Sequence, residues 1–106
     1  MIVVTTDGVP GYRVTKVLGL VQGSSVRARH LGQDILAFFK NLTGGEIREY
    51  TKLLAEAREQ ALDRMREEAT RAGANAILGM RFSSTDISEG ASELLVYGTA
   101  VQIDRT

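Results

Sequence analysis

The chain has 106 residues, no cysteine, and 13 basic against 13 acidic residues. Its 43% hydrophobic and 25% charged residues are typical of a folded globular protein, so residues 1–106 are interpreted as one domain. Balanced charge argues against a nucleic-acid-binding protein, and the lack of cysteine excludes disulfides and thiolate metal sites. No apolar run approaches the ~20 residues of a membrane span, and no signal peptide is recognisable, so a cytoplasmic location is expected.

The first part of the chain predicts two strands, a loop and a short helix. Residues 2–5 are β-branched and favour a short strand. Residues 13–23 predict a second strand with apolar side chains on both faces, which requires cover on both faces. The polar residues 24–33 predict a loop. Residues 34–42 have apolar side chains at helical spacing and predict a short helix.

A long amphipathic helix is predicted over residues 46–72. Its apolar residues recur every three or four positions and share one face, which is rich in alanine and lets a partner backbone come close. Acidic residues at the start and Arg71 near the end match the helix dipole. Gly73 supplies the stop signal, because glycine takes the left-handed conformation that ends helices.

Two further strands are predicted over residues 74–85 and 93–104, joined by a hairpin loop over 86–92. In each strand one face is apolar and the other is nearly as apolar. The first face comprises Ala74, Ala76, Leu78, Met80 and Phe82 in one strand and Leu95, Tyr97, Val101 and Ile103 in the other. Symmetric pairing about the loop places Gly79 near Gly98, where glycine indicates close approach of another segment.

Together these elements predict an α+β fold with a four-stranded, mainly antiparallel sheet. The expected order is strand, strand, short helix, long helix, strand, strand. Two helices cannot easily cover both faces of such a sheet, and a monomer rarely leaves so much apolar surface in water. We therefore expect the subunit to bury this surface against identical copies, in a closed ring or a two-fold pair.

Several short segments, in unbroken order along the chain, carry a family resemblance. They include Gly19-Leu20-Val21-Gln22-Gly23, Gly73-Ala74-Asn75-Ala76-Ile77 and Tyr97-Gly98-Thr99-Ala100-Val101, with residues 26–29, 34–35, 44–46, 50–65 and 80–82 between them. In this set the chain resembles the bacterial YbjQ-like family, which is catalogued as heavy-metal-binding. The resemblance implies an α+β fold with an antiparallel sheet, assembled as a homopentameric ring.

One candidate site is the basic segment that contains Arg27, Arg29 and His30. It could bind an anion or small ligand, or contribute one imidazole per subunit to a ring of ligands around a symmetry axis. The neighbouring arginines repel cations, which favours an anion over a metal. The alternative is a solvated loop histidine with no ligand.

A second candidate site consists of Asp34, Glu46 and Glu49, whose carboxylates could bind a hard divalent cation. Soft heavy metals prefer thiolates and imidazoles, and the chain has no cysteine and one histidine. The alternative is that Glu46 and Glu49 complement the dipole at the start of the long helix. Gly44-Gly45 could expose backbone N–H groups to an anion, but the simpler interpretation is a tight turn.

The sequence therefore predicts a ring-forming homo-oligomeric module that binds a small ligand or a metal ion at subunit interfaces. The alternative is a purely structural or protein-interaction subunit. An enzyme is the third choice, because no serine stands in a nucleophile elbow and no catalytic triad is recognisable.

Overall fold

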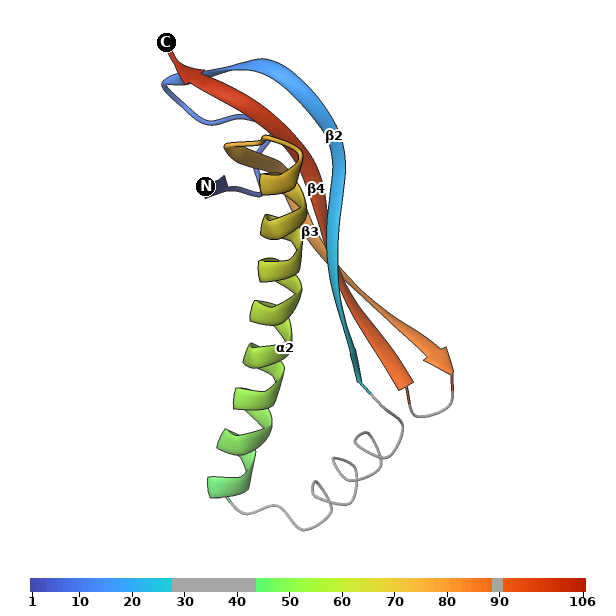
Figure 1. Cartoon of the computed structure of the whole chain (residues 1–106). Coiled ribbons are helices and arrows are strands. Elements are labelled where there is room, and N and C mark those ends of the chain that lie inside the picture. The colour runs from blue at the N-terminus through green and yellow to red at the C-terminus, as the bar shows by residue number, and fades with distance from the viewer. Residues whose placement is uncertain (28–43, 89–90) are drawn as a thin grey trace.

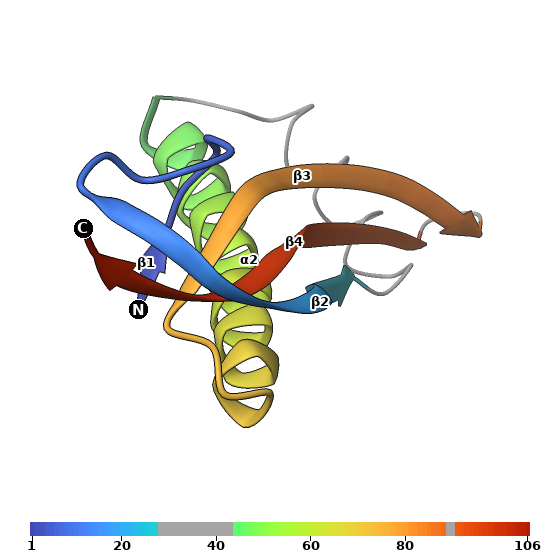
Figure 2. The same ribbon diagram turned by 90° about the horizontal axis from the view of Figure 1, so that it is seen from above.

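The computed structural model describes residues 1–27, 44–88 and 91–106. The described elements are β1 (Ile2–Val3), β2 (Tyr12–Arg27), α2 (Gly44–Arg71), β3 (Ala76–Ser88) and β4 (Ala91–Arg105). The strands form one sheet in the order β1-β3-β4-β2, and α2 crosses one face of it (Figures 1 and 2). The predicted α+β class is confirmed, whereas the predicted helix over 34–42 lies outside the described residues.

The sheet is mixed. β2 and β3 both pair antiparallel with the central strand β4, as expected, but β1 pairs parallel with β3. β1 covers only the start of β3, where the backbone N–H of Val4 donates to the carbonyl of Ile77 and that of Gly79 to the carbonyl of Thr6. Beyond that point β3 has β4 as its only strand neighbour among the described residues. Among the described strands, β2 forms the opposite edge of the sheet.

Helix α2 packs on the sheet through the predicted stripe of small residues. Ala61, Met65 and Ala69 are fully buried, each one turn from the next. The helix ends as predicted at Gly73, whose φ is 90°. The N–H of Gly73 donates to the carbonyl of Thr70, and the N–H of Ala74 donates to that of Ala69, which together form a Schellman motif.

Apolar side chains fill both faces of the sheet, but different segments cover them. On the helix side, Val21, Ile77, Val96 and Ala100 pack against α2. On the other side, a second cluster is formed by Ala76, Leu78, Val101 and Ile103, and Ile2, Val4, Val9 and Tyr12 pack over it. The N-terminal segment therefore does part of the covering that the sequence analysis assigned to other subunits.

The structure corrects four boundaries: the end of β2, the start of α2, the end of β3 and the start of β4. Residues 24–27, predicted as part of a loop, continue strand β2, because the pairing with β4 runs on to Arg27 opposite Ser92. Helix α2 begins at Gly44, earlier than predicted. β3 extends to Ser88 and β4 begins at Ala91, so the predicted seven-residue loop 86–92 is wrong.

A β-bulge in β3 changes the side-chain alternation predicted for that strand. Between Leu78 and Arg81 the register shifts, so Gly98 stands opposite the interval that contains Gly79, whose φ is 64°. Gly79 does lie near Gly98, as predicted. After the bulge Phe82 pairs with Val96 and so lies on the helix side, and Met80 packs with the helix-side cluster. Both were predicted on the face of Leu78.

In the described part of the chain, no helix is both long and apolar enough to cross a membrane.

Candidate functional site

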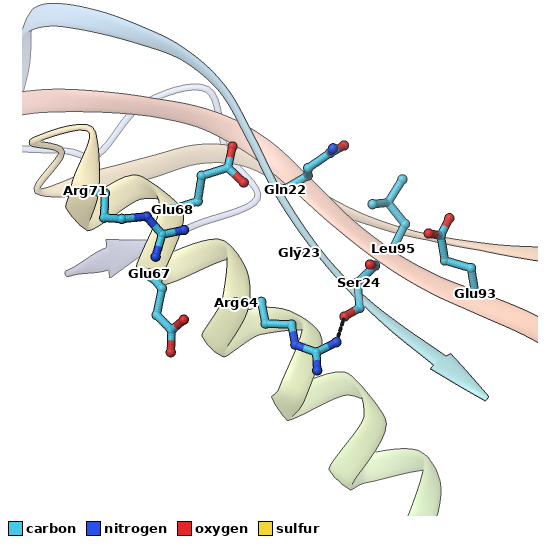
Figure 3. A pocket seen from close by; sticks show the side chains of 9 residues that line it. All are labelled: Gln22, Gly23, Ser24, Arg64, Glu67, Glu68, Arg71, Glu93 and Leu95. Atoms are coloured by element: carbon cyan, nitrogen blue, oxygen red, sulfur yellow. Dashed lines mark hydrogen bonds between the residues drawn. The ribbon is translucent and has the colours of Figure 1, made fainter. Parts of the chain in front are cut away.

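A polar groove lies along the free edge of β2, between this strand and α2 (Figure 3). Its volume is about 460 Å³. Three elements supply the residues that line it: Gln22, Gly23 and Ser24 from β2, Arg64, Glu67, Glu68 and Arg71 from α2, and Glu93 and Leu95 from β4. Because no strand in the described part of the chain pairs with the outer side of β2, the groove combines side chains with unpaired backbone groups of this strand.

At Gly23, one of the residues that line the groove, the backbones of the strand and the helix touch. A Cβ at Gly23 would lie 2.5 Å from the backbone nitrogen of Met65 and closer still to the carbonyl oxygen of Ala61. Only glycine on the strand and small residues on the helix allow this approach. The contact fixes the position of α2 relative to the edge of β2, and therefore the shape of the groove.

Two side-chain hydrogen bonds flank this contact. Ser25 is buried and donates from Oγ to Oε1 of Gln60, 2.9 Å away. Arg64 reaches around the edge of the sheet and donates from Nη1 to the carbonyl oxygen of Ser24 (Figure 3). Arg64 thus satisfies a backbone acceptor on the edge of β2 that would otherwise point to water.

Charged side chains line the groove without forming ion pairs among themselves. It contains the guanidinium groups of Arg64 and Arg71 and the carboxylates of Glu67, Glu68 and Glu93. Within residues 1–27, 44–88 and 91–106, the recorded ion pair joins Arg66 to Asp63 on the outer surface of α2. Apart from Arg64, which donates to the carbonyl of Ser24, these charged groups can face opposite charges on a ligand or on another protein surface.

The structure describes some of the candidate residues from the sequence analysis, while others lie outside the described residues. Arg27 is the last residue of β2, and Glu46 and Glu49 lie in the first two turns of α2. Arg29, His30 and Asp34 lie outside the described residues. The end of β2 and the start of α2 point toward the same end of the molecule (Figure 1). Neither proposed constellation is complete within the described part of the chain.

The described residues do not fit a heavy-metal site. No group of three or more His, Cys, Asp or Glu side chains comes together there in a way that could hold a metal ion. Thiolates, which soft metals prefer, are absent from the sequence. The carboxylates of the groove stand beside two arginines, whose positive charge opposes cation binding.

Sequence reasoning missed the groove, although it contained signals that point to it. Gly23 was assigned to the end of a strand and Ser24 to a loop, so no edge strand was expected beside α2. The alanine-rich stripe around Ala61 did predict that another backbone would approach the helix closely. Combining that stripe with Gly23 would have identified the contact.

The described elements define a small α+β protein in which one long helix lies across a four-stranded mixed sheet with a groove at its edge strand. Comparison with known proteins narrows this class to a family. The model of the YbjQ_1 family, described as "Putative heavy-metal-binding", matches residues 1–104. The chain belongs to this family, as its resemblance in sequence predicted.

Curated relatives match along nearly their whole lengths. A UPF0145 protein of Thermotoga maritima is 54% identical over 105 residues, which covers 99% of both chains. A UPF0145 protein of Thermus thermophilus is 55% identical over 104 residues, covering 98% of this chain and 91% of the relative.

A solved structure shares the fold. It is a protein from Pediococcus pentosaceus, assigned to the DUF74 family and described as having unknown function. The two structures superpose with a TM-score of 0.62, over 98% of each chain, at 17% identity. At this identity, the similarity supports the architecture alone.

Proposed function

We propose that the protein is a ring-forming homo-oligomeric module that binds a small ligand or a metal ion at its subunit interfaces. The family resemblance implies that the ring contains five subunits. The observation that carries the assembly is a patch of apolar side chains left in water on the sheet face away from α2. Val17 and Leu20 of edge strand β2 are 66% and 69% exposed.

This patch extends beyond two residues. Val14 on β2 and Tyr97 on β4 are also exposed, and Leu20 stands opposite Thr99 on the same face. The N-terminal segment covers the sheet only as far as the cluster around Leu78 and Ile103. Contiguous exposed apolar surface on a sheet typically marks a contact with another protein, and identical copies are the simplest partners.

The shape of the isolated subunit also supports assembly. Its Cα radius of gyration is 17.1 Å, whereas a compact domain of this length has about 13 Å. Its accessible surface is 6952 Å², whereas a monomer of this mass has about 5,800 Å². The excess surface is what an oligomer would bury.

The ligand part of the proposal rests on different support. The family description names heavy-metal binding, but the described residues do not form a metal site within one subunit. A site would need Arg27, Arg29 and His30 for an anion, or Asp34, Glu46 and Glu49 for a cation, with contributions from more than one copy. In a ring, each of these residues recurs once per subunit around the axis.

The test is native mass spectrometry of the untagged protein, with elemental analysis of the same sample. We expect a multiple of the 11.5 kDa subunit mass with additional bound mass, or with a stoichiometric metal. A 11.5 kDa monomer at micromolar concentration would overturn the assembly.

Variants separate the two ligand classes. Arg29→Ala with His30→Ala should abolish binding of inorganic phosphate measured by calorimetry, if the ligand is an anion. Glu46→Gln with Glu49→Gln should abolish binding of a divalent cation, if the ligand is a metal. Glu59→Gln, at an exposed position of α2, is the matched control for the second pair. If wild-type protein binds neither probe, the ligand proposal fails.

A second candidate function is a structural or protein-interaction subunit without a ligand. The mixed charges of the groove favour it, because Arg64 and Arg71 beside three glutamates suit a protein surface better than a small ion of either sign. A multimeric protein with no bound mass, and no calorimetric signal with phosphate or divalent cations, would support this alternative.

A further inference from the structure

Among residues 1–27, 44–88 and 91–106, the sheet has two edges that no strand pairs, and these edges are matched in position. On one side is β2, and on the other is the part of β3 beyond the segment that β1 covers. Both pair with the same stretch of β4: Arg27 and Asp86 each stand opposite Ser92, and Gln22 and Arg81 each stand opposite Tyr97. The two edges therefore have similar lengths and lie at the same position along the direction of β4.

The direction of the backbone groups can be followed along β4, whose residues alternate between its two neighbours. The side-chain amide of Asn75 exchanges hydrogen bonds with the backbone N–H and C=O of Ile103, and the backbone N–H of Asn75 donates to the carbonyl of Val101. The backbone N–H and C=O groups of the odd-numbered residues of β4 therefore point toward β3. The backbone groups of Leu95 therefore point toward β3. Its partner on β2, Ser24, directs its own N–H and C=O away from β4. The hydrogen bond from Arg64 to the carbonyl of Ser24 agrees with this assignment.

The same alternation identifies the outward residues of both edges. On β2 they are Gln22, Ser24 and Val26. On β3, the residues that pair with odd-numbered positions of β4 direct their backbone groups toward β4. The residues between them direct theirs outward, and these are Phe82, Ser84 and Asp86. In the described part of the chain no strand pairs with either set. Each edge offers three N–H and three C=O groups, and such rows readily pair with another strand.

We propose that the outward edge of β2 in one subunit pairs with the distal edge of β3 in the next, as a parallel pair that continues the sheet head to tail from copy to copy. This inference rests on the proposed ring and specifies one contact between its neighbouring subunits, in addition to the apolar patch of Val17 and Leu20. Both strands run antiparallel to β4, so they run parallel to each other, and a repeated head-to-tail contact is what closes a ring.

The side chains and the groove fit this pairing. The strand of the incoming copy would lie along the groove between β2 and α2. Phe82, 40% exposed and on the helix side of β3, would enter that groove near Gly23, because both residues stand opposite Val96 in their own sheets. Arg64 would release the carbonyl of Ser24 to the incoming strand.

Proline substitutions test the hydrogen bonding. Ser24→Pro and Ser84→Pro each remove an outward N–H and add a ring at the edge, while the pairing with β4 is kept, since edge positions tolerate proline. Ser24→Ala and Ser84→Ala are the matched controls. We expect both proline variants to shift to the 11.5 kDa monomer mass in native mass spectrometry, with the helical circular dichroism signal retained, and both alanine variants to remain oligomeric.

Cysteine cross-linking tests the same contact without weakening the sheet, since the chain has no cysteine of its own. Ser24 and Ser83 both stand opposite Leu95 and so share a face. The double variants Ser24→Cys/Ser83→Cys and Gln22→Cys/Ser83→Cys cover two neighbouring registers. After mild oxidation, at least one should give a ladder of covalent oligomers on a non-reducing gel. Ser24→Cys/Thr70→Cys, with Thr70 exposed on α2, should not.

The outcomes separate this inference from the proposed function. An oligomeric wild type whose proline variants stay oligomeric, with no ladder from either double variant, would overturn the edge pairing and leave the ring. If the single variant Ser83→Cys formed covalent dimers, two β3 edges would meet in a two-fold contact. This result would also overturn the pairing of β2 with β3. A monomeric wild type would overturn both.

Discussion

Gly23 of β2 lies directly against the backbone of Ala61 in α2, with no room for a side chain between strand and helix. The strand has a glycine at this position and the helix has a stripe of alanines, so the contact depends on small residues in both elements. We predict that Gly23→Ala destabilises the subunit by about 1–3 kcal/mol, because an added methyl group must push two backbones apart.

The control for this prediction is Gly8→Ala. Nothing lies within 4 Å of a Cβ at Gly8, and its backbone does not need glycine. Its free energy of unfolding, measured by urea denaturation at the same protein concentration, should match that of the wild type. Equal stability of Gly23→Ala and the wild type would show that the helix can move away from the strand at no cost.

The hydrogen bond between Ser25 and Gln60 gives an asymmetric prediction. Ser25 is 1% exposed, whereas Gln60 reaches solvent. Ser25→Ala should cost about 0.5–1.5 kcal/mol, since the amide that it leaves can bind water. Gln60→Ala should cost more, about 1–3 kcal/mol, because a buried hydroxyl loses its partner. A double-mutant cycle by chemical denaturation checks this order, and the reverse order would show that the buried hydroxyl of Ser25 does not depend on Gln60 as its partner.

The sequence predicted the parts of this fold that depend on periodic patterns. The buried stripe through Ala61, Met65 and Ala69 was expected, as was the stop at Gly73, because each follows from spacing or from one residue's backbone preference. The shared face of Ala76 and Leu78 was also predicted, whereas Ala74, predicted on the same face, precedes β3 and packs with the helix-side cluster. Helix and strand periods are local properties, so one sequence is enough to reveal them.

The features that the sequence did not predict depend on distant partners. Ser24 and Ser25 were assigned to a loop because they are polar, but Gln60 and Arg64, far away in the chain, satisfy their hydrogen-bonding groups. The bulge at Gly79 reverses the side-chain alternation after it, which a period-two pattern cannot show. The parallel pairing of β1 with β3 joins residues 2–3 to residues 76–77, which are far apart in the chain, and has no local signal.

Asn75 fixes the start of β3 to the end of β4 through both ends of its amide. Its Nδ2 donates to the carbonyl of Ile103 at 2.9 Å, and its Oδ1 accepts from the N–H of Ile103 at 2.8 Å. Asn75→Asp should destabilise the protein more than Asn75→Ala, because a carboxylate oxygen would then face the carbonyl of Ile103. Thermal unfolding of the two variants provides the comparison.

The Asn75→Asp variant should also depend on pH. The facing carbonyl disfavours the charged form, so the pKa of the introduced carboxyl should be higher in the folded than in the unfolded state. Its destabilisation should therefore be largest above the folded pKa and decrease as the pH falls through it. The Asn75→Ala variant, which adds no ionisable group, is the control, and parallel pH profiles for the two would contradict the prediction.

The exposed position of Leu20 distinguishes a subunit contact from an ordinary surface residue. If Leu20 faced only water, Leu20→Lys would change the free energy of unfolding by no more than about 0.5 kcal/mol and leave the mass in solution unchanged. If the patch of Leu20 and Val17 is buried between copies, a lysine there places a charge in an apolar interface. We expect the oligomer to dissociate at concentrations where the wild type is intact, as measured by light scattering after gel filtration. Thr70→Lys, on the outer surface of α2, should leave the assembly unchanged, so that dissociation of both variants would point to net charge rather than to the patch.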